Sequence, residues 1–81
     1  MIHNLKILPC FFHSVKENGK LFEIRDNSDR NFQKGDTVYL TEWKDCKYTG
    51  KMITVLINYV TSFEQKPNFV VFGFSILKAS K

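Results

Sequence analysis

Three charged side chains in the first third of the chain have a spacing that could support chemistry. Lys20, Glu23 and Arg25 are interleaved with apolar residues in the segment GKLFEIR. On an extended strand, Glu23 and Arg25 lie on one face two residues apart, so their side chains can touch. A lysine is a compact charge for phosphate, and the planar arginine fork fits a phosphate or a base edge. The segment therefore predicts a charged cleft, with Lys6 as a further cation and Glu23 orienting Arg25 or a substrate amino group.

A purely structural role for the same residues stays open. Glu23 could pair with Arg25 or a lysine on a solvated sheet face, and exposed pairs of this kind contribute only about 0–1 kcal/mol. Arg30, in the polar loop that follows, is another candidate for phosphate contact. In that loop Asp29 could instead cap a turn, which leaves Arg30 as an ordinary surface arginine.

Aromatic side chains offer a second kind of contact. Trp43 and Tyr48 flank a polar turn and could stack on nucleobases, although a small domain also needs aromatics to fill its core. His3 and His13 lack a partnering serine or cysteine pattern, and we interpret both as structural. No spacing of His, Cys, Asp or Glu suggests a metal ligand set, and we expect no cofactor.

Size and charge limit the possible classes of protein. With 81 residues the chain predicts a single domain, residues 1–81. The net charge of +4 suits a polyphosphate binder, but it also suits ordinary solubility. Cys10 and Cys46 are isolated, so we expect reduced thiols in a cytoplasmic protein. We expect no signal peptide and no membrane-spanning segment.

The hydrophobic pattern indicates a mainly β protein of class α+β, with about five strands and one early helix. We expect strands at residues 3–8, 20–26, 37–43, 51–61 and 69–77, and a helix at 9–18 that ends at Gly19. Short loops favour antiparallel pairing, and strands without a clean solvent face favour closure into a small antiparallel or mixed barrel.

Three expectations concern how these elements are buried. Phe22 and Ile24 are predicted to enter the core, on the face opposite Glu23. Phe32 is predicted to pin its polar loop to the core. The strand at 69–77 is almost continuously apolar, which predicts burial on both sides, with a bulge or sharp bend at Gly73.

Several short motifs, in this order, resemble the ASCH domain of the PUA-like superfamily, and most closely its small phage, prophage and low-GC bacterial members. The motifs are His3, Leu5, Lys6 and Ile7, then Gly19-Lys20, Phe22 to Arg25, Asp29-Arg30, Gly35-Asp36, and Tyr48 to Gly50. The resemblance covers nearly the whole chain. It implies a small PUA-like barrel with a short N-terminal helix beside its opening, and a cleft that binds nucleic acid or a nucleotide.

The same resemblance implies a possible reaction. Some ASCH proteins similar to this one around Lys20 hydrolyse acetylcytidine to cytidine, using the lysine after the helix-ending glycine, a threonine three residues later and a distant glutamate. Lys20 matches the lysine, whereas Glu23 stands in the place of the threonine. Glu42 and Glu64 are the candidates for the glutamate.

Three functions remain as hypotheses. The first is a non-catalytic RNA- or nucleotide-binding module that uses Lys6, Lys20, Glu23, Arg25, Arg30 and Tyr48. The second is an amidohydrolase for an acylated cytidine or similar modified nucleoside, with Lys20 as the reacting group and Glu23 as general acid or base. The third is a phage-borne module that binds a host protein.

Overall fold

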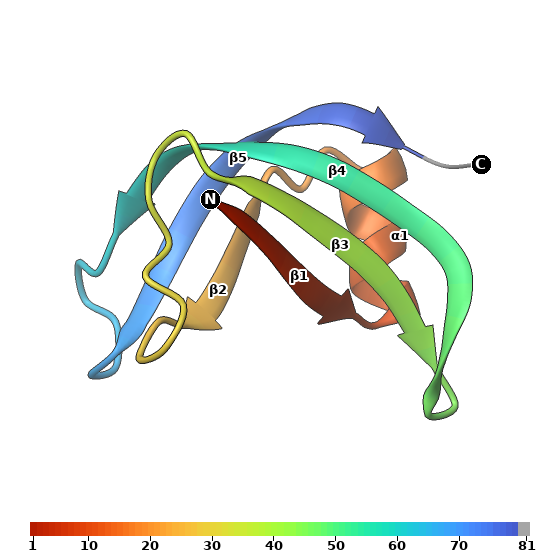
Figure 1. The fold of residues 1–81 in the computed structure, drawn as a ribbon, viewed down its shortest axis with the longest axis horizontal. Coiled ribbons are helices and arrows are strands. Elements are labelled where there is room, and N and C mark those ends of the chain that lie inside the picture. The colour runs from red at the N-terminus through yellow and green to blue at the C-terminus, as the bar shows by residue number, and fades with distance from the viewer. Residues whose placement is uncertain (80–81) are drawn as a thin grey trace.

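One curved sheet and one helix make up the fold in the computed structural model, which describes residues 1–79 (Figure 1). The elements in chain order are β1 (Ile2–Ile7), α1 (Pro9–Glu17), β2 (Phe22–Asp26), β3 (Thr37–Lys44), β4 (Lys47–Thr61) and β5 (Phe69–Ala79). The protein is thus mainly β, with five strands and one short helix, as the sequence predicts. No helix within residues 1–79 is long and apolar enough to cross a membrane.

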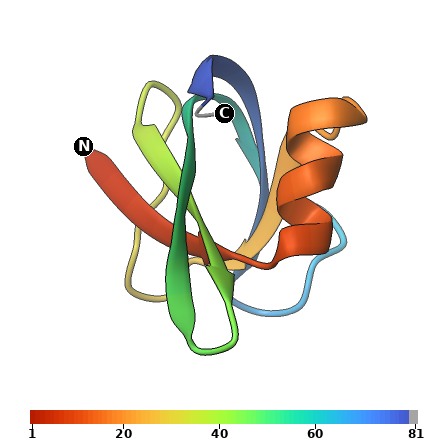
Figure 2. The same cartoon turned by 90° about the vertical axis from the view of Figure 1, so that its right-hand side faces the viewer.

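The sheet is mixed and curls into a half-barrel. Its strand order is β1-β3-β4-β5-β2, so β1 and β2 form the two edges. β1 pairs with β3 in parallel, and the other neighbours are antiparallel. The inference from short loops to antiparallel pairing is wrong for β1, because α1, β2 and a long loop separate it from β3 and provide the crossover that a parallel pair needs. Figure 2 shows the curl of the sheet, with α1 on one side.

Bulges help the long strands to bend. The register between β4 and β5 shifts between Ile57 and Tyr59, at the point where Tyr59 pairs with Gly73. This confirms the predicted irregularity at Gly73, although the extra residue, Asn58, lies in the neighbouring strand. A side chain at position 73 would bring its Cβ within 3.3 Å of the Asn58 Oδ1 atom. A glycine therefore suits this bend.

The core fills the concave face of the sheet. Alternate residues of β1, β3, β4 and β5 point inward, and Phe12 and Val15 of α1 pack against them. The buried apolar residues of the strands are Leu5, Ile7, Val38, Leu40, Ile53, Val55, Ile57, Val70, Phe72 and Phe74. Phe32 is only 2% exposed, which confirms that it holds the loop between β2 and β3 to the core.

Two burial predictions are wrong. In β2, Phe22 and Ile24 are exposed, and Glu23 is the buried residue. Glu23 pairs with the fully buried Phe72 of β5, and this pairing, rather than side-chain polarity, decides which face of the edge strand turns inward. In β5, residues 75–79 are exposed, because β2 flanks that strand only as far as Gly73.

Candidate functional site

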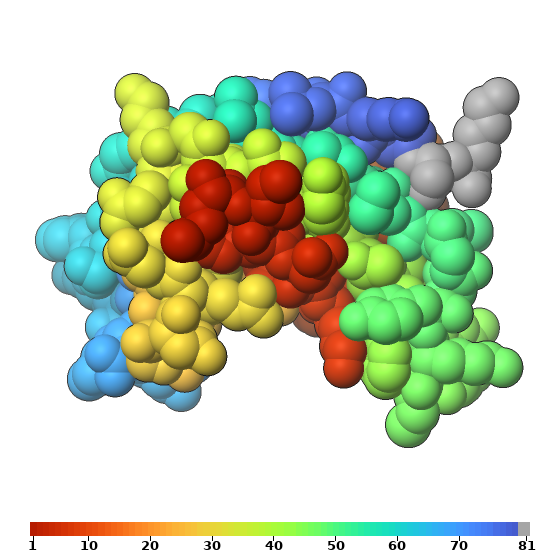
Figure 3. Space-filling view, in the orientation of Figure 1, coloured from red at the N-terminus to blue at the C-terminus, as the bar shows by residue number. Residues whose placement is uncertain are grey.

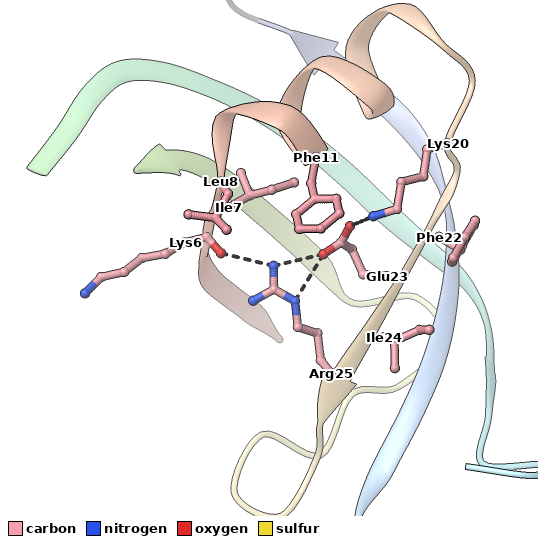
Figure 4. A pocket seen from close by; sticks show the side chains of 9 residues that line it. All are labelled: Lys6, Ile7, Leu8, Phe11, Lys20, Phe22, Glu23, Ile24 and Arg25. Carbon is pink, nitrogen blue, oxygen red and sulfur yellow. Dashed lines mark hydrogen bonds and ion pairs between the residues drawn. The ribbon is translucent and has the colours of Figure 1, made fainter. Parts of the chain in front are cut away.

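A pocket of about 610 Å³ lies where the half-barrel is open, between the end of β1, the start of α1 and the edge strand β2 (Figure 4). The lining residues are Lys6, Ile7, Leu8, Phe11, Lys20, Phe22, Glu23, Ile24 and Arg25. The structure therefore brings together four of the six residues that the sequence predicted for binding. It leaves Arg30 and Tyr48 outside the pocket lining.

Glu23 carries the only buried carboxylate among the residues that line the pocket, and two cations neutralise it. The Lys20 ammonium contacts its Oε2 atom. Arg25 donates to its Oε1 atom from Nε, at 3.1 Å, and from Nη2, at 2.9 Å. Burying a carboxylate is tolerable only when partners of this kind replace its water. One negative and two positive groups leave this cluster with a net charge of +1.

The end of α1 fixes where Lys20 stands. Gly19 adopts a φ of +72°, a conformation that favours glycine, and the Lys20 amide then donates to the Ser14 carbonyl at 3.1 Å. The chain therefore turns back sharply from the helix into β2. This turn brings the Lys20 ammonium above the buried Glu23 carboxylate.

Apolar side chains form the walls around this charged cluster. The Lys20 ammonium lies 5.2 Å from the ring centre of Phe11 and 5.2 Å from that of Phe22. Both rings are nearly half exposed, at 48% and 45%, and Leu8 and Ile24 beside them are also exposed. The site thus presents open aromatic and aliphatic surface next to a positive charge, which suits a flat, partly apolar ligand with a polar edge.

Arg25 of β2 and Arg30 of the loop that follows it both bond to the edge strand β1. Arg25 donates from Nη2 to the Lys6 carbonyl at 3.0 Å, and Arg30 donates from Nη1 to the Asn4 carbonyl at 3.1 Å. No ladder between β1 and β2 is present in the sheet of residues 1–79, so these bonds satisfy carbonyls that an edge strand would otherwise leave to water. Arg30 therefore acts at the β1 edge rather than in the pocket.

The backbone carbonyl and the side chain of Lys6 make contacts on different sides of β1. Its carbonyl accepts the Arg25 bond at the pocket, whereas its side chain points away from the pocket in Figure 4. The ammonium lies 4.0 Å from the ring centre of Trp43. Trp43 in turn makes a T-shaped contact with Tyr48, with ring centres 4.8 Å apart. Tyr48 is 54% exposed.

The glutamates suggested by the resemblance do not line the pocket. Glu42 is buried and accepts a bond of 2.7 Å from the Thr49 hydroxyl. Glu64 is exposed, in the turn after β4. Within residues 1–79 no group of three or more His, Cys, Asp or Glu side chains could hold a metal ion.

Sequence reasoning missed the apolar walls. Phe11 is four positions before Val15 and Phe12 is three before it, so spacing alone puts both rings on the core side of the helix, but the core takes Phe12 and Val15 and leaves Phe11 at the pocket. The signal in the sequence was the pair of adjacent phenylalanines, because only one of two consecutive helical residues can point fully into the core.

A second polar cluster was also missed. Asp36 is buried and accepts bonds from His3 Nε2 at 2.8 Å and from the Gln33 amide at 3.1 Å. Burial alone would raise the pKa of Asp36. The bonds from His3 and Gln33, with the nearby amino group of Met1, outweigh burial and hold that pKa below its ordinary value.

Comparison with known proteins places the chain in a family. Residues 2–74 match the family described as Domain of unknown function (DUF3850). The chain belongs to the DUF3850 family. This DUF3850 domain is also 38% identical over 60 residues to a protein of Escherichia phage P2, described as "Uncharacterized 12.9 kDa protein in GpA 3'region". The match covers 74% of this chain and 54% of the phage protein, so the chain spans about half of that relative's length.

Proposed function

We propose that this DUF3850 domain is a non-catalytic module that binds RNA or a nucleotide, with one unpaired base held in the pocket around Glu23. The observation that supports this most is the combination of open aromatic walls and a net positive cluster in one pocket of about 610 Å³. Pockets of roughly 300–1,000 Å³ suit ligands the size of a nucleoside. A base stacked on an aromatic side chain gains about 1–3 kcal/mol.

The polar edge of a base suits the floor of this pocket. The Glu23 oxygens accept bonds from Lys20 and Arg25, so a base amino group would share an acceptor that is already held in place. The Lys20 ammonium, between the rings of Phe11 and Phe22, meets a base carbonyl or a phosphate oxygen. The resemblance to the ASCH domain, a PUA-like fold, supports the same class of ligand.

The contacts also limit how many phosphates the site takes. Glu23 offsets one of the two positive charges of Lys20 and Arg25, so the charge in excess at the pocket is small. We expect about two to four phosphate contacts, with a salt dependence of roughly −0.7 in log K per contact for a single strand.

Binding of fluorescent single-stranded RNA, measured by anisotropy across a salt series, tests the proposal. Phe22→Ala removes one wall of the pocket without opening the core, and we expect about tenfold weaker binding from the loss of one stacking surface. Phe63→Ala is the matched control, because Phe63 is 75% exposed and does not line the pocket. Absence of binding at low salt, or equal affinities for the two variants, would refute the proposal.

A second candidate is the amidohydrolase, because Lys20 and Glu23 touch each other inside a pocket large enough for a nucleoside. In this reaction water cleaves the amide of an acylated cytidine to give cytidine and the free acid. Lys20 would first pass a proton to Glu23 and so gain a free electron pair. Mass spectrometry of acylated nucleosides incubated with the protein decides: turnover that Lys20→Ala abolishes favours the enzyme, and no turnover favours the binding module.

A further inference from the structure

The hairpin that joins β3 and β4 carries charge and aromatic surface that the pocket does not use. We define the basic hairpin as residues 43–51. Its lysines are Lys44, Lys47 and Lys51, against the single carboxylate of Asp45, which gives a net charge of +2. All four of these charged residues are exposed. The hairpin therefore holds half of the net +4 of the whole chain.

An exposed aromatic ring accompanies this charge. Tyr48 stands on the basic hairpin in a T-shaped contact with Trp43, and more than half of its surface is open to solvent. The Lys6 ammonium lies over the Trp43 ring, 4.0 Å from its centre. Aromatic rings interleaved with lysines are the arrangement by which proteins hold successive nucleotides of a single strand.

Lys6 connects the basic hairpin to the pocket. Its carbonyl is bonded to Arg25 at the pocket, and its ammonium lies on the hairpin side. In Figure 3 the surface is hollowed between the segment around the end of β2, in yellow-orange, and the hairpin, in green, with the end of β1 between them. A ligand leaving the pocket along this hollow meets Lys6 first and the basic hairpin next.

We propose that the ligand of this domain is single-stranded RNA longer than one nucleotide, which runs from the pocket past Lys6 onto the basic hairpin and stacks a second base on Tyr48. This rests on the proposed function, and it adds a second contact surface and a minimum ligand length. The strand must be single, because a base paired in a duplex can neither enter the pocket nor stack on Tyr48.

The experiment compares two ligands of different length. Uridine monophosphate reaches only the pocket, whereas a pentamer of uridylate reaches the hairpin as well. We expect Tyr48→Ala to weaken pentamer binding about tenfold and to leave uridine monophosphate unchanged. Phe22→Ala should weaken both ligands. Tyr59→Ala is the matched control, since Tyr59 is 63% exposed on β4 and lies outside both surfaces.

Lys47→Gln gives an independent measurement that does not depend on the packing of Tyr48 against Trp43. It should make the salt slope of pentamer binding shallower by about 0.7, and leave that of uridine monophosphate unchanged. Thermal unfolding of each variant shows that the fold is kept.

The outcomes separate the two proposals. The path along the hairpin is overturned if the pentamer binds no more tightly than the monophosphate, or if Tyr48→Ala behaves like Tyr59→Ala while Lys47→Gln leaves the salt slope unchanged. In that case Phe22→Ala still weakens binding, and the pocket remains the site. If neither ligand binds the unaltered protein, the proposed function fails and the path along the hairpin fails with it.

Discussion

Glu23 and Asp36 are buried to almost the same extent near the two ends of β1, and their surroundings differ. Glu23 is 4% exposed and Asp36 is 6% exposed. His3, near the start of β1, bonds to Asp36, and Lys6, near its end, shares Arg25 with Glu23. Burying a carboxylate costs free energy at both places, so each needs donors to offset it.

The difference lies in the donors. His3 has only 4% of its side chain exposed, whereas Met1, whose amino group lies 3.3 Å from the Asp36 Oδ1 atom, is exposed; neither Asp36 nor any of its partners lines the pocket around Glu23. The partners of Glu23 keep contact with water, with 21% of the Lys20 side chain and 26% of the Arg25 side chain exposed. A ligand can compete for donors only where they line a pocket that admits it. Burial of a charge therefore marks a candidate site only when its partners open onto a pocket, and Asp36 is by this criterion a structural group.

Removing each carboxylate tests this comparison with the largest expected effect. Asp36→Ala should lower the free energy of unfolding by about 3 kcal/mol, because it leaves the buried His3 ring nitrogen without a partner, at about 1–3 kcal/mol, and also removes the acceptor of the part-buried Gln33 amide. Glu23→Ala should cost about 1 kcal/mol, since Lys20 and Arg25 can turn to water. Urea unfolding measures both, with Asp29→Ala, an exposed aspartate, as the control. An equal loss for both variants would contradict the distinction.

Acid should weaken the cluster around Asp36. The pKa of Asp36 is held below its ordinary value of 3.8, so the unfolded chain takes up this proton at a higher pH than the folded protein does. The stabilisation that ionised Asp36 gives the fold is therefore complete at a pH above its ordinary pKa. It is lost as the pH falls through the lowered pKa of the folded protein. The free energy of unfolding changes with pH by at most about 1.4 kcal/mol per pH unit for one proton.

Urea unfolding as a function of pH checks this, with Asp36→Asn expected to flatten the acid limb. Asp26 is the comparison, because bonds from the amide and hydroxyl of Ser28 also lower its pKa, although it is exposed. Asp26→Asn should also flatten the acid limb, because its pKa is lowered as well. An acid limb that is the same in Asp36→Asn and in the unaltered protein would show that Asp36 does not contribute to it.

The strands could be predicted from the sequence because they depend on local pattern, but the orientation of β2 could not. Alternation fixes which residues share a face, and Glu23 and Arg25 do share one. It does not fix which face turns inward, and the choice made by polarity alone put Phe22 in the core. Pairing with Phe72, far along the chain, decides that choice, and an edge strand with cations nearby can bury a glutamate.

The charged part of the pocket could be predicted, and the rest depends on contacts between distant segments. Lys20, Glu23 and Arg25 lie within six residues, so their proximity is local. Arg30 and the Asn4 carbonyl are 26 positions apart, and β1 and β2 are not paired by a ladder that a pattern could predict. The roles of the two arginines at the β1 edge therefore appear only in three dimensions.

That edge offers the smallest expected effect and the finest test of the comparison. Arg30→Ala removes one bond to the Asn4 carbonyl, and we expect a loss of about 1 kcal/mol in the free energy of unfolding. Hydrogen exchange should quicken at the amides of β1 and stay unchanged in β4, because only β1 loses a contact at its free edge. Lys34→Ala, which removes an exposed cation from the same loop, is the matched control for charge. Equal exchange rates at β1 in the two variants would mean that the bond from Arg30 does not protect β1, and that of the two arginine bonds to this strand only the one from Arg25, which also neutralises Glu23, could do so.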